Sequence, residues 1–565
     1  MSTSFGKGNG GSVDRDWNHT GVTVALCTVI TLVLIAEFIL NCTPPISRDA
    51  LIHHLAIPKL WLRHGGFYEM PWAVFSYYPM NIDLLYLGSL YFHNDVLPKF
   101  IHCAFGIGIA FLIYSYLNRR LGRNWALLGV IIFFTTPLVI RLATAAYVDL
   151  GMVFFITASV MSWIKWRDTD YRTIWWLVLS AACMGLAAGS KHNAPVAWFF
   201  VNLALVFCYS RDTKRGASAV KYGAVFFGIT LLVVSPWYIK NVILMGNPIY
   251  PLFDGLFQYF RHVDGSGVQG VAGALSTEWS GNIFQRRYIM FGEGFWEVLL
   301  VPVRMFFQGR DYSAQYFDGV LNPLLFMMVP FAFLGRNKNR DAGFFIAFSL
   351  FFMGIAYFLT AIRVRYILPI IPFLTILTVV GIRNIVETVE KKEGWFRFIG
   401  LVSVVAFVTV FISFNIFYLK NYWNTLQPLQ YVLGEETKEA FLSRHVGSYP
   451  AIRYINDTLP QDARVFLMFL GGRGYYLERD YWHEPSFGMN SLKEMVQSSK
   501  SEEDFQSVMQ KIAYTHVLLR TDMFDKFLRD NYSREEIVLF FNRVKRYWKP
   551  LFGAGLYAVY EISLD

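Results

Sequence analysis

Side chains that could carry out acid–base or phosphate chemistry occur in several short segments of this sequence, each beside a long apolar run. The first segment, "SRDALIHHLAIPKLWL", contains Asp49, His53 and His54 and closely follows the apolar run 22–41. In an α-helix, His53 would share a face with Asp49, four residues earlier, whereas His54 would point about 140° away. Asp49 could equally be the N-cap of an amphipathic helix that lies on a membrane surface.

The other candidate side chains also lie at the ends of apolar runs. A Lys or Arg at such a position often only extends to the lipid headgroups, and an Asp can cap the helix that follows it. The candidates are Asp83 in "YYPMNIDLLYL", Asp149 in "AAYVDLGMVFF", Lys191 and His192 in "GLAAGSKHNAP", Lys240 in "SPWYIKN", and Arg363, Arg365 and Tyr366 in "RVRYILPIIP".

Cations and carboxylates together in one pocket would suit a particular class of reaction. The cations suit a phosphate held at the boundary between lipid and water. The carboxylates suit a general base, or a metal site if they converge. Group transfer from a lipid phosphate to a hydroxyl needs both, because a base takes the acceptor proton while cations stabilise the departing phosphate.

The apolar runs predict a polytopic α-helical membrane protein. The 565-residue chain is 55% hydrophobic and only 16% charged, against about 25% charged in soluble proteins, and its mean hydropathy is +0.36. Eleven runs are long enough to cross a hydrocarbon core as helices. They lie near residues 22–41, 97–117, 124–141, 148–165, 173–189, 194–210, 218–236, 319–335, 342–361, 366–383 and 397–418.

Basic residues in the short loops predict the orientation in the membrane. If every run crosses once, the basic loops share one side, which the positive-inside rule assigns to the cytoplasm. The N-terminus is then cytoplasmic, and all the candidate residues lie at the external face. These loops explain most of the net charge of +10, and no basic stripe or RNA-binding motif indicates a nucleic-acid partner. The basic loops lie near 119–123, 165–172, 211–215, 336–340 and 383–397.

Composition divides the chain into three predicted parts. Residues 1–20 begin with a Gly- and Ser-rich stretch and are expected to be a disordered cytoplasmic tail. Residues 21–418 form the transmembrane domain, with external loops at 42–96 and 241–318. Residues 419–565 are expected to be an external α/β domain, with helices at 437–456 and 503–514 and strands at "ARVFLMFL", "THVLLR" and "GLYAVYEI". Five cysteines in or beside the runs argue against a disulfide framework or a zinc site.

Six of these motifs, in order and on the expected side, resemble glycosyltransferases of the GT-C fold. The closer resemblance is to the bacterial branch related to protein O-mannosyltransferases and to the lipid A aminoarabinose transferase. The motifs are the first-loop Asp, the tyrosine-proline segment, the aspartate before the fourth helix, the Lys turn, "SPWYIKNVILMGNPIYP" and "RVRYILPIIP". The resemblance covers residues 20–420 and implies a GT-C fold with about eleven transmembrane helices.

The resemblance also implies roles for single residues. Asp49 matches the catalytic carboxylate, and Asp149 is a second acidic site residue. Lys191 and Arg365 match ligands of the donor phosphate, with Lys240 and Arg363 as further candidates. Asp83, His192 and Tyr366 lie within the matching motifs as additional site candidates, and His54 fits the pattern better than His53.

The sequence departs from the family pattern at two motifs. The Lys turn reads Lys191-His192-Asn193-Ala194-Pro195, where better-known relatives often have Lys-Gly-Pro. Asp49 is followed by Ala50 instead of the Glu usual in protein O-mannosyltransferases, which counts against a protein acceptor. A divalent cation (Mg or Mn) held by Asp49, His54 and Asp149 would follow the precedent of distant oligosaccharyltransferases, but a phosphate leaving group does not require one.

We therefore expect an inverting sugar transferase in the bacterial inner membrane, with a periplasmic active site and C-terminal domain. Its donor would be a sugar on polyprenyl (undecaprenyl) phosphate, its acceptor a hydroxyl of a glycan, lipid or protein, and no cofactor is required. One alternative is a ligase or polymerase that uses a lipid-diphosphate donor. Another is a transporter or flippase of lipid-linked glycans, which would favour charges buried in mid-span and inverted repeats.

Overall fold

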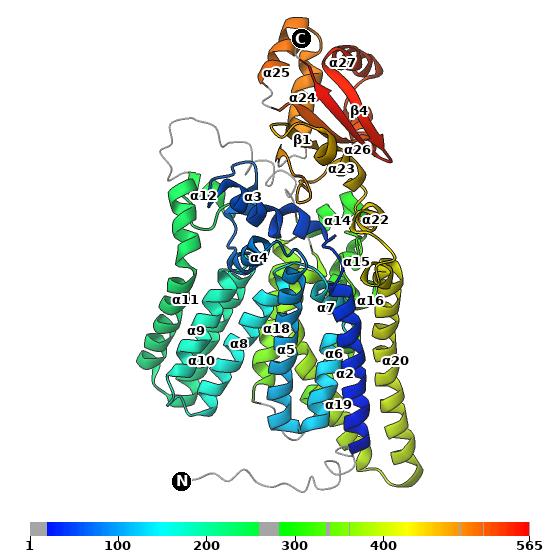
Figure 1. The fold of residues 1–565 in the computed structure, drawn as a ribbon. Coiled ribbons are helices and arrows are strands. Elements are labelled where there is room, and N and C mark those ends of the chain that lie inside the picture. The colour runs from blue at the N-terminus through cyan, green and yellow to red at the C-terminus, as the bar shows by residue number, and fades with distance from the viewer. Residues whose placement is uncertain are drawn as a thin grey trace.

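The computed structural model describes residues 20–258, 282–334, 340–360, 362–484, 488–511 and 514–563. The predicted tail (except Thr20), the middle of the loop 241–318 and the last residue of the runs 319–335 and 342–361 lie outside these ranges. A bundle of long helices carries a layer of short helices at one end, and the C-terminal domain lies above that layer (Figure 1).

Six helices in the described ranges are long and apolar enough to cross a membrane. Their helical conformation satisfies the backbone hydrogen bonds internally, and their mostly apolar side chains suit lipid. They are α2 (Thr20–Asn41), α5 (Leu97–Leu121), α10 (Ala194–Thr213), α11 (Gly216–Met245), the continuous η4 and α19 (Val364–Ile370 and Ile371–Glu390), and α20 (Gly394–Leu426).

The run 124–141 is broken into α6 (Arg123–Phe134) and α7 (Pro137–Ala143), which meet at 71°. Pro137 explains the break, since proline disfavours a helical conformation in the residue before it. Counting this pair gives a seventh candidate span. Eleven crossings stay a prediction, because the other predicted runs form helices that are too short or too polar to count as membrane spans by themselves. They are α8 (Asp149–Asp168), α9 (Trp175–Ala188), α17 with η3 (Leu324–Met327, Val329–Phe333) and α18 (Ala342–Leu359).

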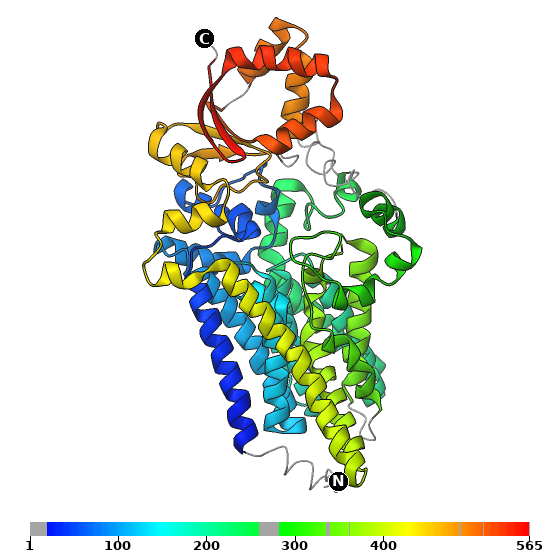
Figure 2. The same ribbon diagram turned by 90° about the vertical axis from the view of Figure 1, so that its right-hand side faces the viewer.

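The long helices differ in how much protein surrounds them. In the most apolar 18-residue stretch of η4–α19, 89% of the residues are buried. In the corresponding stretches of α2 and α20, only 11% are buried. Side chains such as Leu32 and Phe38 on α2 and Phe417 on α20 are about 60% exposed. Apolar surface of this extent suits contact with lipid, and α2 and α20 lie together at one edge of the bundle (Figures 1 and 2).

Short helices from two parts of the chain cover one end of the bundle (Figure 1). The first loop supplies η1 (Ala50–His54), α3 (Ala56–His64), η2 (Val74–Tyr77) and α4 (Asn81–Tyr91). The second supplies α12 (Asp254–Gln258), α14 (Ile283–Phe291), α15 (Phe295–Leu299) and α16 (Val301–Phe307). Ile57, Leu60 and Trp61 of α3 share a hydrophobic core with the C-terminal domain, so that domain packs directly on the first loop.

The C-terminal segment follows α20, which continues to Leu426, past the predicted boundary at 418. It folds around a five-stranded sheet in the order β2-β1-β3-β5-β4. Strands β1, β2 and β3 are parallel, and β5 pairs antiparallel with both β3 and β4. The strands are β1 (Arg464–Met468), β2 (Asp480–Trp482), β3 (His516–Arg520), β4 (Trp548–Ala554) and β5 (Tyr557–Ile562). The helices are α21 (Pro428–Val432), α22 (Lys438–His445), α23 (Tyr449–Thr458), α24 (Met489–Ser498), α25 (Glu502–Lys511), α26 (Thr521–Asn531) and α27 (Arg534–Tyr547).

The helix expected at 437–456 forms as two helices, α22 and α23, and the other expected elements form at α25, β1, β3 and β5. The sequence did not reveal β2 or β4. β2 has only three residues, and β4 contains Pro550 and Gly553, which are both unfavourable in strands.

Candidate active site

A cavity of about 690 Å³ lies between the helix bundle and the C-terminal domain. Its wall is formed by the first loop, α7, the segment 311–318, η4, the end of α20, and two parts of the C-terminal segment, His445–Val446 and the loop that carries Arg473. Its charged lining consists of the aspartates Asp49, Asp311 and Asp318 and the arginines Arg48, Arg141, Arg363, Arg365 and Arg473.

Asp49 and Arg365 form an ion pair in this cavity, with side chains only 18% and 12% exposed. Asp49 is the N-cap of η1, but its side chain makes no capping hydrogen bond, so capping does not account for the carboxylate. Burial by itself would raise the pKa of Asp49, but the charge of Arg365 holds the pKa well below its usual range. Asp49 is therefore an ionised carboxylate that could accept a proton.

The segment after Asp49 forms a π-helix instead of the expected α-helix. Leu55 N–H donates to the carbonyl of Ala50, five residues earlier, at 3.0 Å. Because a π-turn contains an extra residue, the side chains four and five positions after Asp49 both turn towards it. His53 and His54 are accordingly both buried, with ring centroids 4.0 Å apart, and both lie within electrostatic range of Asp49.

His54 pairs with Asp83 in the layer behind Asp49. His54 Nδ1 lies 2.7 Å from Asp83 Oδ1, and both residues are buried. Burial lowers the pKa of His54 to about 3 and raises the pKa of Asp83 to about 7. Burial thus opposes charge on both members of the pair. His53 stacks on Phe75 at 4.3 Å.

Asp149 and Lys191 form a second, largely buried pair, with Lys191 Nζ donating to Asp149 Oδ1 at 2.6 Å. Asp149 is fully buried at the start of α8, but Val148 is the N-cap, so Asp149 is not the capping residue. The other carboxylate oxygen, Oδ2, has no hydrogen-bond partner in the described part of the chain. Arg365 lies within electrostatic range of Asp149, which links this pair to the Asp49 pair.

Two of the remaining predicted residues lie with Arg365, and two do not. Arg363 lines the cavity 3.9 Å from Asp318, and the Tyr366 ring lies 5.7 Å from the Arg365 guanidinium. Lys240 Nζ donates to the carbonyl of Ser76 at 2.7 Å and does not line the cavity. His192 packs against the Tyr78 ring at 4.4 Å, also away from the cavity. Lys240 and His192 therefore hold the first loop in place.

The three residues proposed to bind a metal each have another partner in the structure. Asp49 pairs with Arg365, His54 with Asp83, and Asp149 with Lys191. Across the described ranges, no group of three or more His, Cys, Asp or Glu side chains is arranged to hold a metal ion. A divalent cation held by Asp49, His54 and Asp149 stays a prediction.

The sequence analysis missed Tyr147. Its hydroxyl accepts a hydrogen bond from Asp49 N–H at 3.3 Å, and its ring lies 5.9 Å from the Arg365 guanidinium. The signal was its position two residues before Asp149 in a motif already singled out.

A network around Arg141 was also missed. Arg141 Nη1 donates to Asp311 at 2.7 Å and to Asp318 at 3.2 Å, and Tyr418 O–H donates to Asp311 at 2.6 Å. Arg141 is the last residue of the predicted run 124–141 but was not singled out there, and the two aspartates lie in a long loop without a recognisable motif.

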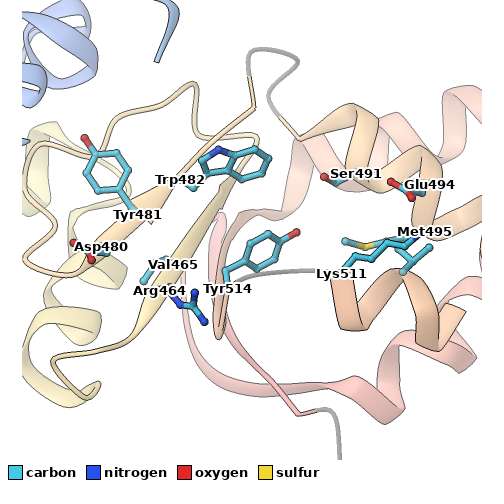
Figure 3. Close-up of a pocket in the computed structure, with 11 residues that line it drawn as sticks. Arg464, Val465, Asp480, Tyr481, Trp482, Ser491, Glu494, Met495, Lys511 and Tyr514 are labelled. Atoms are coloured by element: carbon cyan, nitrogen blue, oxygen red, sulfur yellow. The ribbon is translucent and has the colours of Figure 1, made fainter. Parts of the chain in front are cut away.

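A second cavity, of about 460 Å³, lies within the C-terminal domain. Figure 3 shows the rings of Trp482 and Tyr514 on one side and Ser491, Glu494 and Met495 of α24 on the other. The charged residues in its described lining are all exposed, at Arg464, Asp480, Glu494 and Lys511. We place the chemistry in the first cavity, where Arg141, Arg363 and Arg365 each pair with an aspartate.

Residues 65–245, roughly a third of the chain, match the family model described as dolichyl-phosphate-mannose-protein mannosyltransferase. Two solved structures of ArnT from Cupriavidus metallidurans, one apo and one bound to undecaprenyl phosphate, each match with a TM-score of 0.55 and 14% identity, covering 96% of this chain and 98% of theirs. The chain has the GT-C fold. The apo oligosaccharyltransferase of Archaeoglobus fulgidus also shares this GT-C architecture, with a TM-score of 0.52, 11% identity and coverage of 94% of this chain and 74% of that one. No curated protein matches the sequence significantly.

Proposed function

We propose that this protein transfers a sugar from a polyprenyl-phosphate donor to an acceptor hydroxyl at the periplasmic face of the bacterial inner membrane. The observation that carries the proposal is the largely buried Asp49–Arg365 pair in a cavity of a GT-C fold. It brings a base and a phosphate-binding cation together at one end of the helix bundle. The likeness to the ArnT structure that contains undecaprenyl phosphate supports the choice of lipid.

In the proposed reaction, Asp49 takes the proton of the acceptor hydroxyl while the hydroxyl oxygen bonds to the anomeric carbon of the donor. The bond from that carbon to the phosphate oxygen breaks, and its electron pair stays on the phosphate. Arg365, close to Asp49, stabilises the charge that develops there. A single displacement of this kind inverts the configuration of the sugar.

The paired state also suggests how donor binding could activate the base. Without substrate, Arg365 neutralises Asp49 and Lys191 neutralises Asp149. A donor phosphate that attracts Arg365 would weaken its hold on Asp49, and the pKa of the buried carboxylate would rise. The base would then become stronger when a donor is present.

Helix α20 provides a path between the lipid and the cavity. Tyr418, Tyr422 and Thr425 of α20 line the cavity, whereas Phe417 on the same helix is 60% exposed. A polyprenyl chain could therefore lie along the outside of α20 while its phosphate enters the site.

The test uses purified protein in proteoliposomes with labelled sugars on polyprenyl monophosphate or polyprenyl diphosphate, plus an extract of envelope acceptors. We expect label to reach an acceptor from the monophosphate donor only, with release of polyprenyl phosphate. Transfer from the diphosphate donor alone would favour the ligase or polymerase alternative. Lipid movement without sugar transfer would favour the transporter and contradict the proposal.

A further inference from the structure

One cavity arginine comes from the C-terminal domain. Arg473 lies in the loop 469–478, between β1 and β2, and lines the cavity. Glycines shape this loop. Gly472 has a φ of +75°, which disfavours other residues, and a Cβ on Gly474 would lie 2.2 Å from the Tyr481 ring.

The loop 469–478 is tied to the segment that carries Asp49. Tyr475 N–H donates to the carbonyl of Leu51 in η1 at 3.2 Å. Lys59 Nζ donates to the carbonyls of Tyr475 and Leu477 at 2.8 and 3.1 Å, and Tyr476 O–H donates to that of Pro45 at 2.7 Å. These bonds fix the position of Arg473 relative to the proposed base.

Arg473 and Arg48 differ from the other arginines of the cavity. Arg141, Arg363 and Arg365 each pair with an aspartate. Arg48 and Arg473 make no ion pair or side-chain hydrogen bond within the described residues, and Arg473 Nε is buried without a partner.

The surroundings of Arg473 favour an anion. Burial, followed by the positive charge of Arg48, lowers the pKa of Arg473, yet an arginine with its very high ordinary pKa stays charged. Five arginines against three aspartates leave the cavity lining with a formal charge of +2. A bound anion would offset the repulsion between Arg48 and Arg473 and would accept a hydrogen bond from Arg473 Nε.

We propose that Arg48 and Arg473 form a phosphate-binding site at the domain-facing wall of the cavity, so that the C-terminal domain completes the substrate site. The guanidinium fork of arginine matches phosphate oxygens in a bidentate manner. Identifying the anion as a substrate phosphate rests on the proposed function. That phosphate belongs either to the polyprenyl carrier or to a second, water-soluble substrate.

The test measures binding of two probes, undecaprenyl phosphate and inorganic phosphate, to the full-length protein in detergent. It compares wild type, Arg473→Gln, Arg473→Lys and Arg48→Gln. Arg453→Gln is the matched control, since Arg453 is an exposed arginine of the same domain that pairs only with Asp457. Losing one charged hydrogen-bonding partner is expected to weaken binding about tenfold, and lysine should restore part of it because it keeps the charge.

The outcomes separate the possibilities. Weaker binding of undecaprenyl phosphate in Arg473→Gln and Arg48→Gln assigns the site to the carrier, which is the result we expect. A loss confined to inorganic phosphate supports the site and assigns it to a second substrate. Unchanged binding of both probes in the two Gln variants would overturn the inference. If wild type binds phosphate but not the lipid, the proposed donor is wrong, while the Arg473 comparison still decides whether this site exists.

Discussion

At the scale of single residues, the site consists of charges that neutralise one another until substrate arrives. Asp49 with Arg365 and Asp149 with Lys191 are largely buried pairs, and His54 with Asp83 is a fully buried one. Motifs in the sequence were enough to select these residues, because polar groups beside apolar runs stand out. Their pairing could not be predicted, since Arg365 lies 316 positions from Asp49 and only the tertiary fold brings them together.

The variant Arg365→Gln tests whether Arg365 keeps Asp49 ionised. Without the guanidinium, burial dominates and the pKa of Asp49 rises, so the base becomes protonated in mildly acidic solution. We expect kcat/KM for the donor to be lower than in wild type at every pH. It should also fall further as the solution becomes acidic, which wild type does not show. Arg363→Gln is the control, because Arg363 shares the cavity but pairs with Asp318. An unchanged pH profile in Arg365→Gln would argue against the coupling.

Variants of the His54–Asp83 pair should change stability with pH in opposite directions. Between pH 3.8 and about 7, Asp83 is protonated in the folded state but ionised in the unfolded state. The contribution of Asp83 to stability therefore falls as pH rises. Between pH 6.5 and about 3, His54 is neutral in the folded state but protonated in the unfolded state. The contribution of His54 to stability therefore rises with pH. Thermal unfolding between about pH 4 and 6 should therefore show Asp83→Asn gaining stability with pH and His54→Gln losing it. Parallel profiles in the two variants would contradict these protonation states.

At the scale of elements, two irregular segments position the site. The π-turn at Ala50–His54 directs both histidines towards Asp49, and the loop 469–478 brings Arg473 to the same cavity. The sequence favoured an ordinary helix for the first, because helical periodicity does not register one extra residue in a turn. The regular strands β1, β3 and β5 were predictable, since their apolar and β-branched residues bury well in a sheet.

Gly474→Ala tests the docking of the loop 469–478. Because the new Cβ would lie 2.2 Å from the buried Tyr481 ring, the loop or the ring must move, at a cost on the order of 1–3 kcal/mol. We expect a lower Tm and weaker phosphate binding, since Arg473 moves with the loop. Gly553→Ala in β4 is the control, with no atom within 4 Å of its added Cβ. Equal Tm and phosphate binding in the two variants would show that close packing at Gly474 is not needed.

At the scale of the whole molecule, the cavity lies where the helix bundle, the first loop and the C-terminal domain meet. Apolar runs and basic loops predicted the bundle and the end that carries the site, because burial in lipid and the positive-inside rule act on local composition. The cavity wall itself could not be predicted. Arg141, Asp318 and Arg473 come from three distant segments, and only their packing brings them together.

Cysteine labelling tests the predicted orientation. Asp462→Cys, exposed before β1, should react with a membrane-impermeant maleimide in intact spheroplasts, because the C-terminal domain is expected outside. Arg172→Cys, exposed in a basic loop, should react only after the membrane is opened. Both substitutions are made in a Cys27→Ser background, since Cys27 is the exposed native cysteine. Labelling of Arg172→Cys in intact spheroplasts would contradict the predicted orientation and place this loop outside.

The most direct test of the account is sugar transfer by Asp49→Asn, measured beside binding of undecaprenyl phosphate to the same preparation. Asparagine keeps the size of the side chain but cannot take a proton from the acceptor, and general-base catalysis typically contributes about 100- to 10,000-fold. We predict that transfer from the polyprenyl-phosphate donor falls by at least about 100-fold, while lipid binding and Tm stay near those of wild type. Near-normal transfer by folded Asp49→Asn that binds the lipid would contradict the assignment of Asp49 as the base.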